Sequence, residues 1–259
     1  MKDILRQFSV IFTVILTITI NALANILPIN GLNTGQISDS FKVFFVPAGY
    51  VFSIWGIIYI GLISIAIYQA LPANREAASQ RASGWWISLG GLANSAWIFL
   101  WHYQQFVLSV LVMLLLLATL IITYINLGIN SAKVTSAERW AVHLPISVYL
   151  GWITVATVAN ITVMLEYLNW GRFGLDPLTW MGIILGAVVI IASLVNVTRR
   201  DSAYTAVILW ALVGIAVKFS ENSFVLWASV ISIALVFGSL LISKAMPNLF
   251  KKGVSNAKS

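Results

Sequence analysis

Long apolar stretches alternate with short polar connections along most of this chain. A helix needs about 20 consecutive, predominantly apolar residues to cross a bilayer. By this criterion the sequence predicts eight helical spans, over residues 8–28, 47–71, 85–103, 105–129, 139–165, 177–198, 203–219 and 223–243. The predicted fold class is therefore all-α, a polytopic membrane helix bundle with about eight transmembrane helices.

The first span and the segment after it need separate comment. Residues 22–24, Ala-Leu-Ala, resemble a signal-peptide cleavage site, but the apolar run continues through Ile26 and Leu27. This continuation favours a retained helix over a cleaved leader. The polar segment that follows, up to about Val46, is long for a connection between membrane helices. We expect this segment to act as a lid.

Composition and charge agree with a membrane protein and predict its orientation. Only 9% of the residues are charged, whereas soluble domains have about 25%. If the eight spans alternate, all of the 15 Lys and Arg residues except Lys42, Arg172 and Lys218 lie on one side. Positive charge concentrates on the cytoplasmic side of membrane proteins. We therefore expect both termini in the cytoplasm, and we expect a bacterial inner or plasma membrane.

The absence of some residue types, and the position of others outside the predicted spans, disfavours several functional classes. The net charge of +7 comes from connections on one side, with no basic stripe interleaved with aromatic residues, so no nucleic-acid partner is expected. The chain has no cysteine, which excludes disulfides and thiolate chemistry. No Asp, Glu or Arg lies deep in a predicted span. Proton-coupled pumps and voltage sensors place ionisable groups there, so both classes are disfavoured.

Three titratable residues have an ordinary and a functional interpretation. His102, at the end of the third span, is interpreted as a solvated interfacial histidine rather than a metalloporphyrin ligand. His143 is interpreted as a hydrogen-bonding group in helix packing rather than a proton relay. Lys218, beside Glu221, is interpreted as an interfacial lysine rather than the retinal-binding lysine of a photoreceptor.

Three predicted spans each carry aromatic and hydrogen-bonding side chains at helical spacing, three or four residues apart. These candidate site residues are Trp55 and Tyr59 on the second span, Asn94 and Trp97 on the third, and Tyr149, Trp152, Ala156 and Asn160 on the fifth. Converging stripes would form a flat-walled apolar pocket for a planar, hydrophobic ligand. Alternatively, the same groups bond each other and only hold the helices together. The spacing leaves both interpretations open.

The same positions resemble the TspO/MBR family, the translocator or tryptophan-rich sensory proteins. Pro47, Trp55, Gly56 and Tyr59 are similar to the family's second-helix motif, and Asn94 and Trp97 to the N-x-x-W of its third helix. The fifth-helix pattern Y-L-x-W-x-x-x-A-T-x-x-N matches from Tyr149 to Asn160. The resemblance implies a five-helix bundle with a pocket under the first loop. It also implies that Trp55, Asn94, Trp97 and Trp152 contact a porphyrin or related tetrapyrrole.

The predicted organisation follows from the part of the chain that these motifs cover. Residues 1–168 are expected to form a TspO-like five-helix membrane bundle, residues 169–246 three additional transmembrane helices, and residues 247–259 a basic cytoplasmic tail. The protein is expected to lie in the lipid bilayer and to bind a hydrophobic small molecule, with no cofactor required. By analogy with the family, a homodimer is expected.

The predicted function is that of a membrane sensor or regulator that binds this ligand. Three alternatives stay open at the level of sequence. The protein could transport a neutral hydrophobic solute, it could modify a bound tetrapyrrole as an enzyme, or its stripes could only pack helices in a structural subunit. No catalytic or metal-binding residues are assigned.

Overall fold

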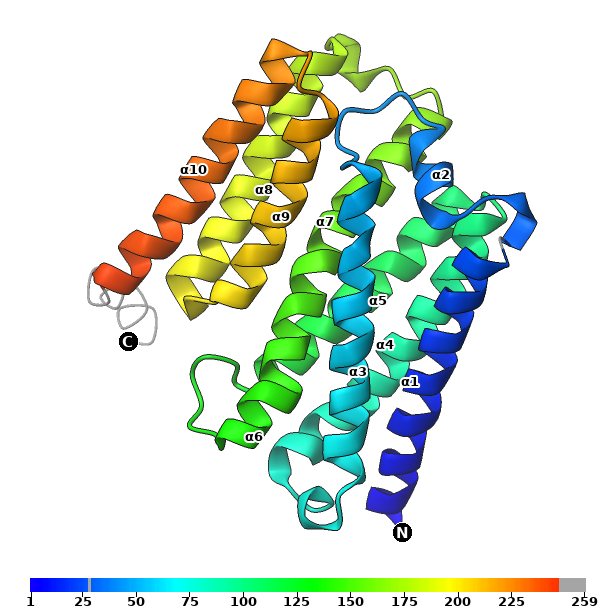
Figure 1. Cartoon of the computed structure of the whole chain (residues 1–259), viewed down its shortest axis with the longest axis vertical. Helices are drawn as coiled ribbons and strands as arrows, with labels where there is room; N and C mark the ends of the chain where they lie inside the picture. Colours follow the sequence, from blue (N-terminus) through cyan, green and yellow to red (C-terminus); the bar gives the residue numbers. More distant parts are fainter. Residues whose placement is uncertain (28, 247–259) are drawn as a thin grey trace.

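The computed structural model describes residues 1–27 and 29–246, and within these residues all regular secondary structure is helical, with no strand (Figure 1). Pro28 and the predicted tail, 247–259, lie outside the described residues. The long helices are α1 (Lys2–Ile26), α3 (Ile54–Ala70), α4 (Ala78–His102), α5 (Phe106–Asn126), α7 (Leu144–Tyr167), α8 (Pro177–Arg199), α9 (Ser202–Lys218) and α10 (Ser223–Ala245). The short helices are η1 (Ile29–Gly31), α2 (Thr34–Asp39), η2 (Gly49–Ser53), η3 (Pro72–Asn74), α6 (Ser136–Glu138), η4 (Arg139–His143) and η5 (Arg172–Gly174).

The long helices correspond one to one with the predicted spans, which confirms the all-α, polytopic fold class. Six helical segments of the described chain are long and apolar enough to cross a membrane by length and composition alone. The two long helices outside that set are α9, with 17 residues, and α4, whose interior carries polar residues. Helix α4 begins at Ala78 rather than at the predicted residue 85. Its first turns persist because Gln80 and Ser83 are completely buried there.

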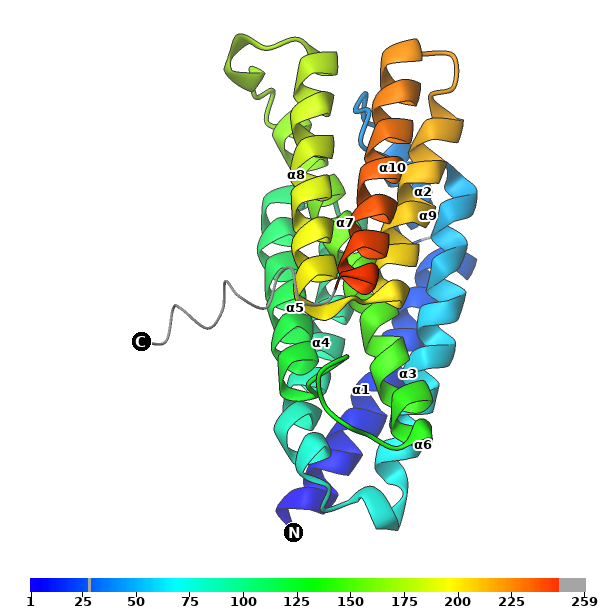
Figure 2. The same cartoon turned by 90° about the vertical axis from the view of Figure 1, so that its left-hand side faces the viewer.

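The helices form two groups that share α7. In the first group α4 packs against both α1 and α5, while α7 packs against α5 and α3. In the second group α10 packs against α8 and α9, and α9 packs against α7 (Figures 1 and 2). Helix α7 is consequently buried along most of its length. The division of the chain at residue 168 stays a prediction.

The α7–α9 contact is close because a glycine lies at the crossing point. A Cβ atom on Gly151 would lie 2.9 Å from the backbone oxygen of Tyr204. Small residues allow membrane helices to approach in this way. Next to this crossing, the carboxylate of Asp201 accepts hydrogen bonds from Tyr124 Oη at 2.8 Å and from Ser147 Oγ at 2.6 Å. One side chain therefore joins α5, α7 and the start of α9.

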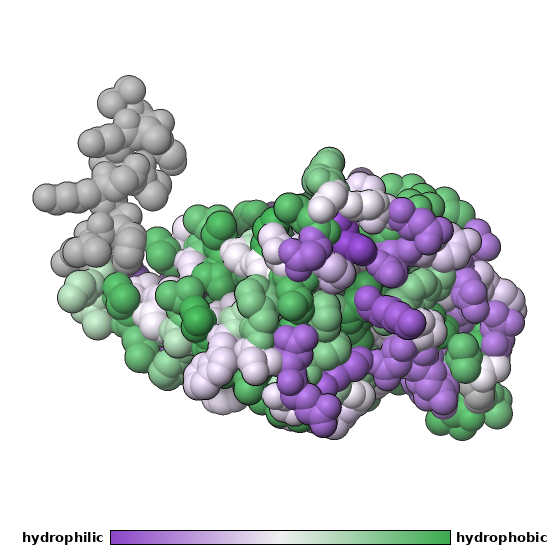
Figure 3. Space-filling model, turned by 90° about the horizontal axis from the view of Figure 1, so that it is seen from above, coloured by the Kyte–Doolittle hydropathy of each residue, from purple (hydrophilic) through white to green (hydrophobic). Residues whose placement is uncertain are grey.

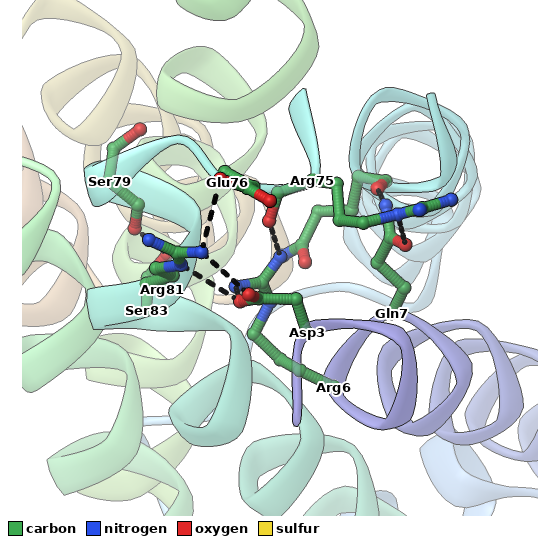
Figure 4. Close-up of polar contacts among 9 residues, drawn as sticks. Asp3, Arg6, Gln7, Arg75, Glu76, Ser79, Arg81 and Ser83 are labelled. Carbon is green, nitrogen blue, oxygen red and sulfur yellow. Dashed lines mark hydrogen bonds and ion pairs between the residues drawn. The ribbon is translucent and has the colours of Figure 1, made fainter. Parts of the chain in front are cut away.

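The end of the bundle that carries the N-terminus is held by a buried arginine (Figure 4). Arg6 is only 1% exposed; its Nη1 donates to Asp3 Oδ1 at 2.8 Å and its Nη2 to the backbone oxygen of Arg75 at 2.6 Å. Gly84 makes room for it, because a Cβ there would lie 2.6 Å from Arg6 Cδ. In the sequence Arg6 counted only toward the charge asymmetry. The structure gives it a second role, as a link between α1 and the α3–α4 connection.

The opposite end of the bundle is covered by residues 29–46, which we call the lid. It contains η1 and α2 and leads into η2 and α3 (Figure 1). Seen from this end, hydrophilic residues gather over one part of the face, and much of the rest is hydrophobic (Figure 3). The predicted lid lies over the helix ends at this side of the bundle (Figure 1).

Candidate ligand-binding site

The lid is an ordered segment because its own polar residues start a helix. Asn33 caps α2 by accepting a hydrogen bond from the Gln36 amide at 2.9 Å, and the Gln36 side chain accepts one from the Asn33 amide at 2.9 Å. This reciprocal capping box satisfies two amide groups that the first helical turn would otherwise leave unpaired. The six-residue helix α2 can therefore form in the middle of a long connection.

His102 fastens the lid to the end of α4. Its Nδ1 lies 3.0 Å from the backbone oxygen of Ile29, and its Nε2 lies 3.1 Å from Thr34 Oγ1. Because a carbonyl oxygen only accepts, Nδ1 donates to Ile29, and in the neutral ring Nε2 then accepts from the Thr34 hydroxyl. The side chain is 1% exposed. The prediction of a solvated histidine is therefore wrong, because the lid covers the ring and engages both ring nitrogens. This arrangement also leaves neither nitrogen for a metal.

The other end of the lid is attached to α9 and the residue after it. Asp39, at the end of α2, forms an ion pair with Lys218. Phe44 packs edge-on against Phe219, with ring centroids 5.3 Å apart. The Ala48 amide, just past the lid, donates to the backbone oxygen of Gly214 at 3.2 Å. Helix α9 and Phe219 thus hold the lid against the bundle, and the ionic partner of Lys218 is Asp39 on the lid.

A cavity of about 40 Å³ lies beneath the lid between α3, α4 and α7. The lid and the segment after it contribute Thr34, Ser38, Pro47 and Phe52, and the three long helices contribute Trp55, Trp97, Trp101, Trp152, Val155, Ala156, Ala159 and Asn160. The structure therefore brings the three predicted stripes together. Trp55, Trp97, Trp152, Ala156 and Asn160 line the cavity itself. Tyr59, Asn94 and Tyr149 lie outside this lining.

Indole rings form the walls of the cavity. Trp55 contacts Trp152 at a centroid distance of 6.1 Å and an interplanar angle of 80°, and it stacks on Tyr59 at 5.7 Å and 24°. Trp97 stacks on Trp101 at 5.5 Å and 23°. Edge-to-face and offset contacts of this kind are the favoured geometries of aromatic pairs. The rings are therefore fixed by one another and present flat apolar surfaces.

The two amides among the predicted site residues are hydrogen-bonded to other side chains. Asn94 Nδ2 donates to Tyr149 Oη at 2.8 Å, and its Oδ1 accepts from Asn21 at 2.6 Å. Asn160 Oδ1 accepts from Trp97 Nε1 at 2.9 Å, and its Nδ2 donates to Ser109 Oγ at 2.9 Å. Both amides join neighbouring helices, which is the structural role that the sequence left open beside ligand binding.

Trp152 differs from these groups because its polar atom has no partner. The side chain is 3% exposed, and its Nε1 makes no hydrogen bond to any described residue. Trp97 Nε1 and Trp101 Nε1 are both satisfied, by Asn160 and by the Thr34 backbone oxygen. A buried donor without an acceptor is costly. Of these three indoles of the cavity wall, Trp152 is therefore the one whose buried donor is left for a ligand.

Some lining residues were not among the predicted ones. Trp101 lies one helical turn beyond Trp97, so its spacing alone places it on the same stripe. Val155 and Ala159 flank the fifth-span stripe but carry no polar or aromatic group that would distinguish them. Thr34 and Ser38 come from the lid, and no periodicity in the sequence indicates which lid residues face the helices.

Replacing Asn94 with alanine is expected to lower the free energy of unfolding. Its effect on ligand binding should be indirect, because Asn94 lies outside the cavity lining. The change leaves the Asn21 amide and the Tyr149 hydroxyl without their buried partner, which costs about 1–3 kcal/mol. The free energy of unfolding in detergent, from a denaturant titration, measures the loss. Asn126→Ala is the matched control, because its exposed side chain gives up a single hydrogen bond to the Ala82 backbone oxygen. Equal losses for both variants would contradict a structural role for Asn94.

The fold and this site define a multi-pass helical membrane protein with an aromatic cavity beneath a lid. Within that class, the chain matches the family described as TSPO-like protein over residues 7–242, and it belongs to this family. The match extends through α8 and α9 and most of α10, whereas the sequence motifs carried the resemblance only to about residue 168. Comparison with curated proteins and with solved structures gave no match.

Proposed function

We propose that this protein is a membrane sensor or regulator that binds a planar, hydrophobic ligand, a porphyrin or a related tetrapyrrole, in the cavity beneath the lid. The observation that carries the proposal is the unpartnered, buried Nε1 of Trp152 in a wall of indole rings. Flat aromatic surfaces and a small number of placed polar groups are typical of sites for such ligands. We also propose, from the distribution of positive charge, that the N-terminal end faces the cytoplasm.

The ligand enters only when the lid moves. The cavity measures about 40 Å³, whereas sites for drug-sized ligands measure roughly 300–1,000 Å³. The lid residues Thr34 and Ser38 and the following Pro47 close one side of it. Displacing them would extend the cavity toward the end of the bundle without separating α3, α4 and α7. In the open state the ligand would lie against Trp55 and Trp152, with Trp152 Nε1 donating to a polar atom of the ligand.

Titration of the purified protein with protoporphyrin IX tests this proposal. We expect a saturable shift in porphyrin absorbance together with quenching of tryptophan fluorescence. Trp152→Phe keeps the aromatic surface and removes the donor, so we expect about tenfold weaker binding, and Trp152→Ala a larger loss. Trp227→Ala, which removes an exposed indole on α10, is the matched control. Absence of saturable binding, or the same affinity in all variants, would overturn the proposal.

A further inference from the structure

A second and larger cavity lies at the junction between the two helix groups, which we call the junction cavity. Its volume is about 390 Å³. It is lined by the connection between α5 and α6, by η4 and the start of α7, by the α8–α9 turn and by the end of α10. None of its lining residues lines the cavity beneath the lid. It therefore requires its own explanation.

Positive charge dominates the junction cavity. Arg139, Arg200 and Lys244 line it, against the single carboxylate of Asp201. Asp201 is 1% exposed, and besides its bonds to Tyr124 and Ser147 it accepts hydrogen bonds from two backbone amides at the start of α9. In the described part of the chain, neither Arg139 nor Lys244 forms an ion pair with a carboxylate. The cavity can therefore accept an anion.

An unpartnered buried group lines the same cavity. His143 is 5% exposed, and its Nε2 makes no hydrogen bond to any described residue. The sequence predicted that His143 forms a hydrogen bond between packed helices, but its Nε2 forms none with the described residues. Buried polar atoms normally have a partner in the protein, in ordered water or in a ligand. Phosphate oxygens are suitable partners for arginine, lysine and histidine together.

An apolar groove continues from the junction cavity along the membrane-facing side of the protein. The groove has a volume of about 480 Å³ and is bordered by Ser53, Ile54, Ile57, Leu144, Val148, Ala203, Ala206, Val207 and Trp210. Leu144 and Ala203 line both spaces, so the groove and the cavity adjoin. A polar, cationic cavity at the helix ends is thus joined to an apolar channel between α3, α7 and α9.

We propose that the junction cavity and the groove together bind one anionic phospholipid. The phosphate lies between Arg139 and Lys244 near His143, and an acyl chain follows the groove past Ala206 toward Trp210. Basic pockets between transmembrane helices at the membrane surface bind anionic lipid headgroups, and an apolar groove provides van der Waals contacts along the acyl chain. A soluble phosphate would use only the cavity and leave the groove without a function. The lipid would thereby bridge the two helix groups.

The test is lipid binding by the full-length, delipidated protein in detergent, followed by native mass spectrometry. We expect dioleoylphosphatidylglycerol to bind about tenfold more tightly than dioleoylphosphatidylcholine, because only the first carries a net negative charge. The double variant Arg139→Gln/Lys244→Gln should lose this preference. Lys133→Gln is the matched control, since Lys133 lies in the same connection, is exposed and does not line the cavity. An unchanged preference in the double variant, or none in the wild type, would overturn the site.

A second variant separates a lipid from a soluble phosphate. Ala206→Phe fills the groove and leaves the cations in place, and we expect it to weaken phosphatidylglycerol binding about tenfold. Ala206→Leu, a smaller change, should give an intermediate loss if the phenylalanine variant does not fold. Binding of glycerol 3-phosphate, measured by calorimetry, should be much weaker than binding of the lipid in the wild type. If glycerol 3-phosphate binds as tightly as the lipid and Ala206→Phe changes neither affinity, the lipid proposal is wrong.

Discussion

Asp201→Ala will reduce the free energy of unfolding by about 3–7 kcal/mol, a large stability effect for a single substitution. The change removes the cap of α9, which contributes about 1 kcal/mol. It also leaves the buried hydroxyls of Tyr124 and Ser147 without an acceptor, at about 1–3 kcal/mol each. A denaturant titration in detergent, monitored by circular dichroism, measures the loss.

Asp176 provides a matched control because it is also an aspartate at a helix start. It caps α8 by accepting from the amides of Leu178 and Thr179, but it is exposed and its other contact is with the Thr179 hydroxyl. That hydroxyl, followed by the amides, holds the pKa of Asp176 below its usual range. Asp176→Ala should cost about 1 kcal/mol. Equal losses for the two aspartates would contradict the bridging role of Asp201.

His102→Ala will accelerate ligand exchange, because it releases the lid from α4. The substitution removes two hydrogen bonds, to the Ile29 backbone oxygen and to the Thr34 hydroxyl. At about 1 kcal/mol for each bond, the population of the open lid should rise at least tenfold. Association and dissociation rates of protoporphyrin IX should both increase, as expected when a lid controls access. Stopped-flow absorbance measures both rates.

The neighbouring Tyr103 is the control for the His102 experiment. Its side chain is exposed at the same end of α4, and no hydrogen bond or ring contact joins that side chain to a described lid residue. Tyr103→Ala should leave both rates unchanged. Rates that stay at the wild-type value in His102→Ala would show that this histidine does not restrain the lid.

The helices could be predicted from the sequence because their apolar runs are long and almost free of charge. One boundary that moved is the start of α4, where Gln80 and Ser83 look like loop residues but are buried by neighbouring helices. The mean hydropathy of a stretch of sequence reflects the polarity of such residues, but it contains no information about the neighbouring helices that bury them. The same limitation applies to Arg6, which is charged and lies near the N-terminus, yet is almost completely buried.

The convergence of the three stripes could also be predicted, but the division of roles among their residues could not. Trp55 and Trp152 line the cavity, whereas Asn94 bonds Tyr149 and Asn21. Helical spacing places residues on one face of a helix and does not reveal which neighbour that face meets. His102 shows the consequence most clearly, since its partners come from the lid, about 70 residues away in the sequence.

The C-terminal helices gained a role that the motifs did not indicate. The TSPO-like match includes them, and α9 contacts both the lid and η2, which leads into α3. Trp210 Nε1 donates to the Val51 backbone oxygen at 3.1 Å, and a Cβ on Gly214 would lie 2.1 Å from Val51 Cγ2. The segment that leads from the lid into α3 is therefore fitted to α9. Lid, cavity and C-terminal helices form one connected arrangement.

The most direct test of ligand binding beneath the lid is to fill the cavity and measure the dissociation constant of protoporphyrin IX. Ala156 lines the cavity on α7. Ala156→Trp should weaken binding at least tenfold, because the added indole occupies the ligand's position. Ala187→Trp, on an exposed face of α8, should have no effect. The same dissociation constant in Ala156→Trp and in the wild type would show that the ligand binds elsewhere.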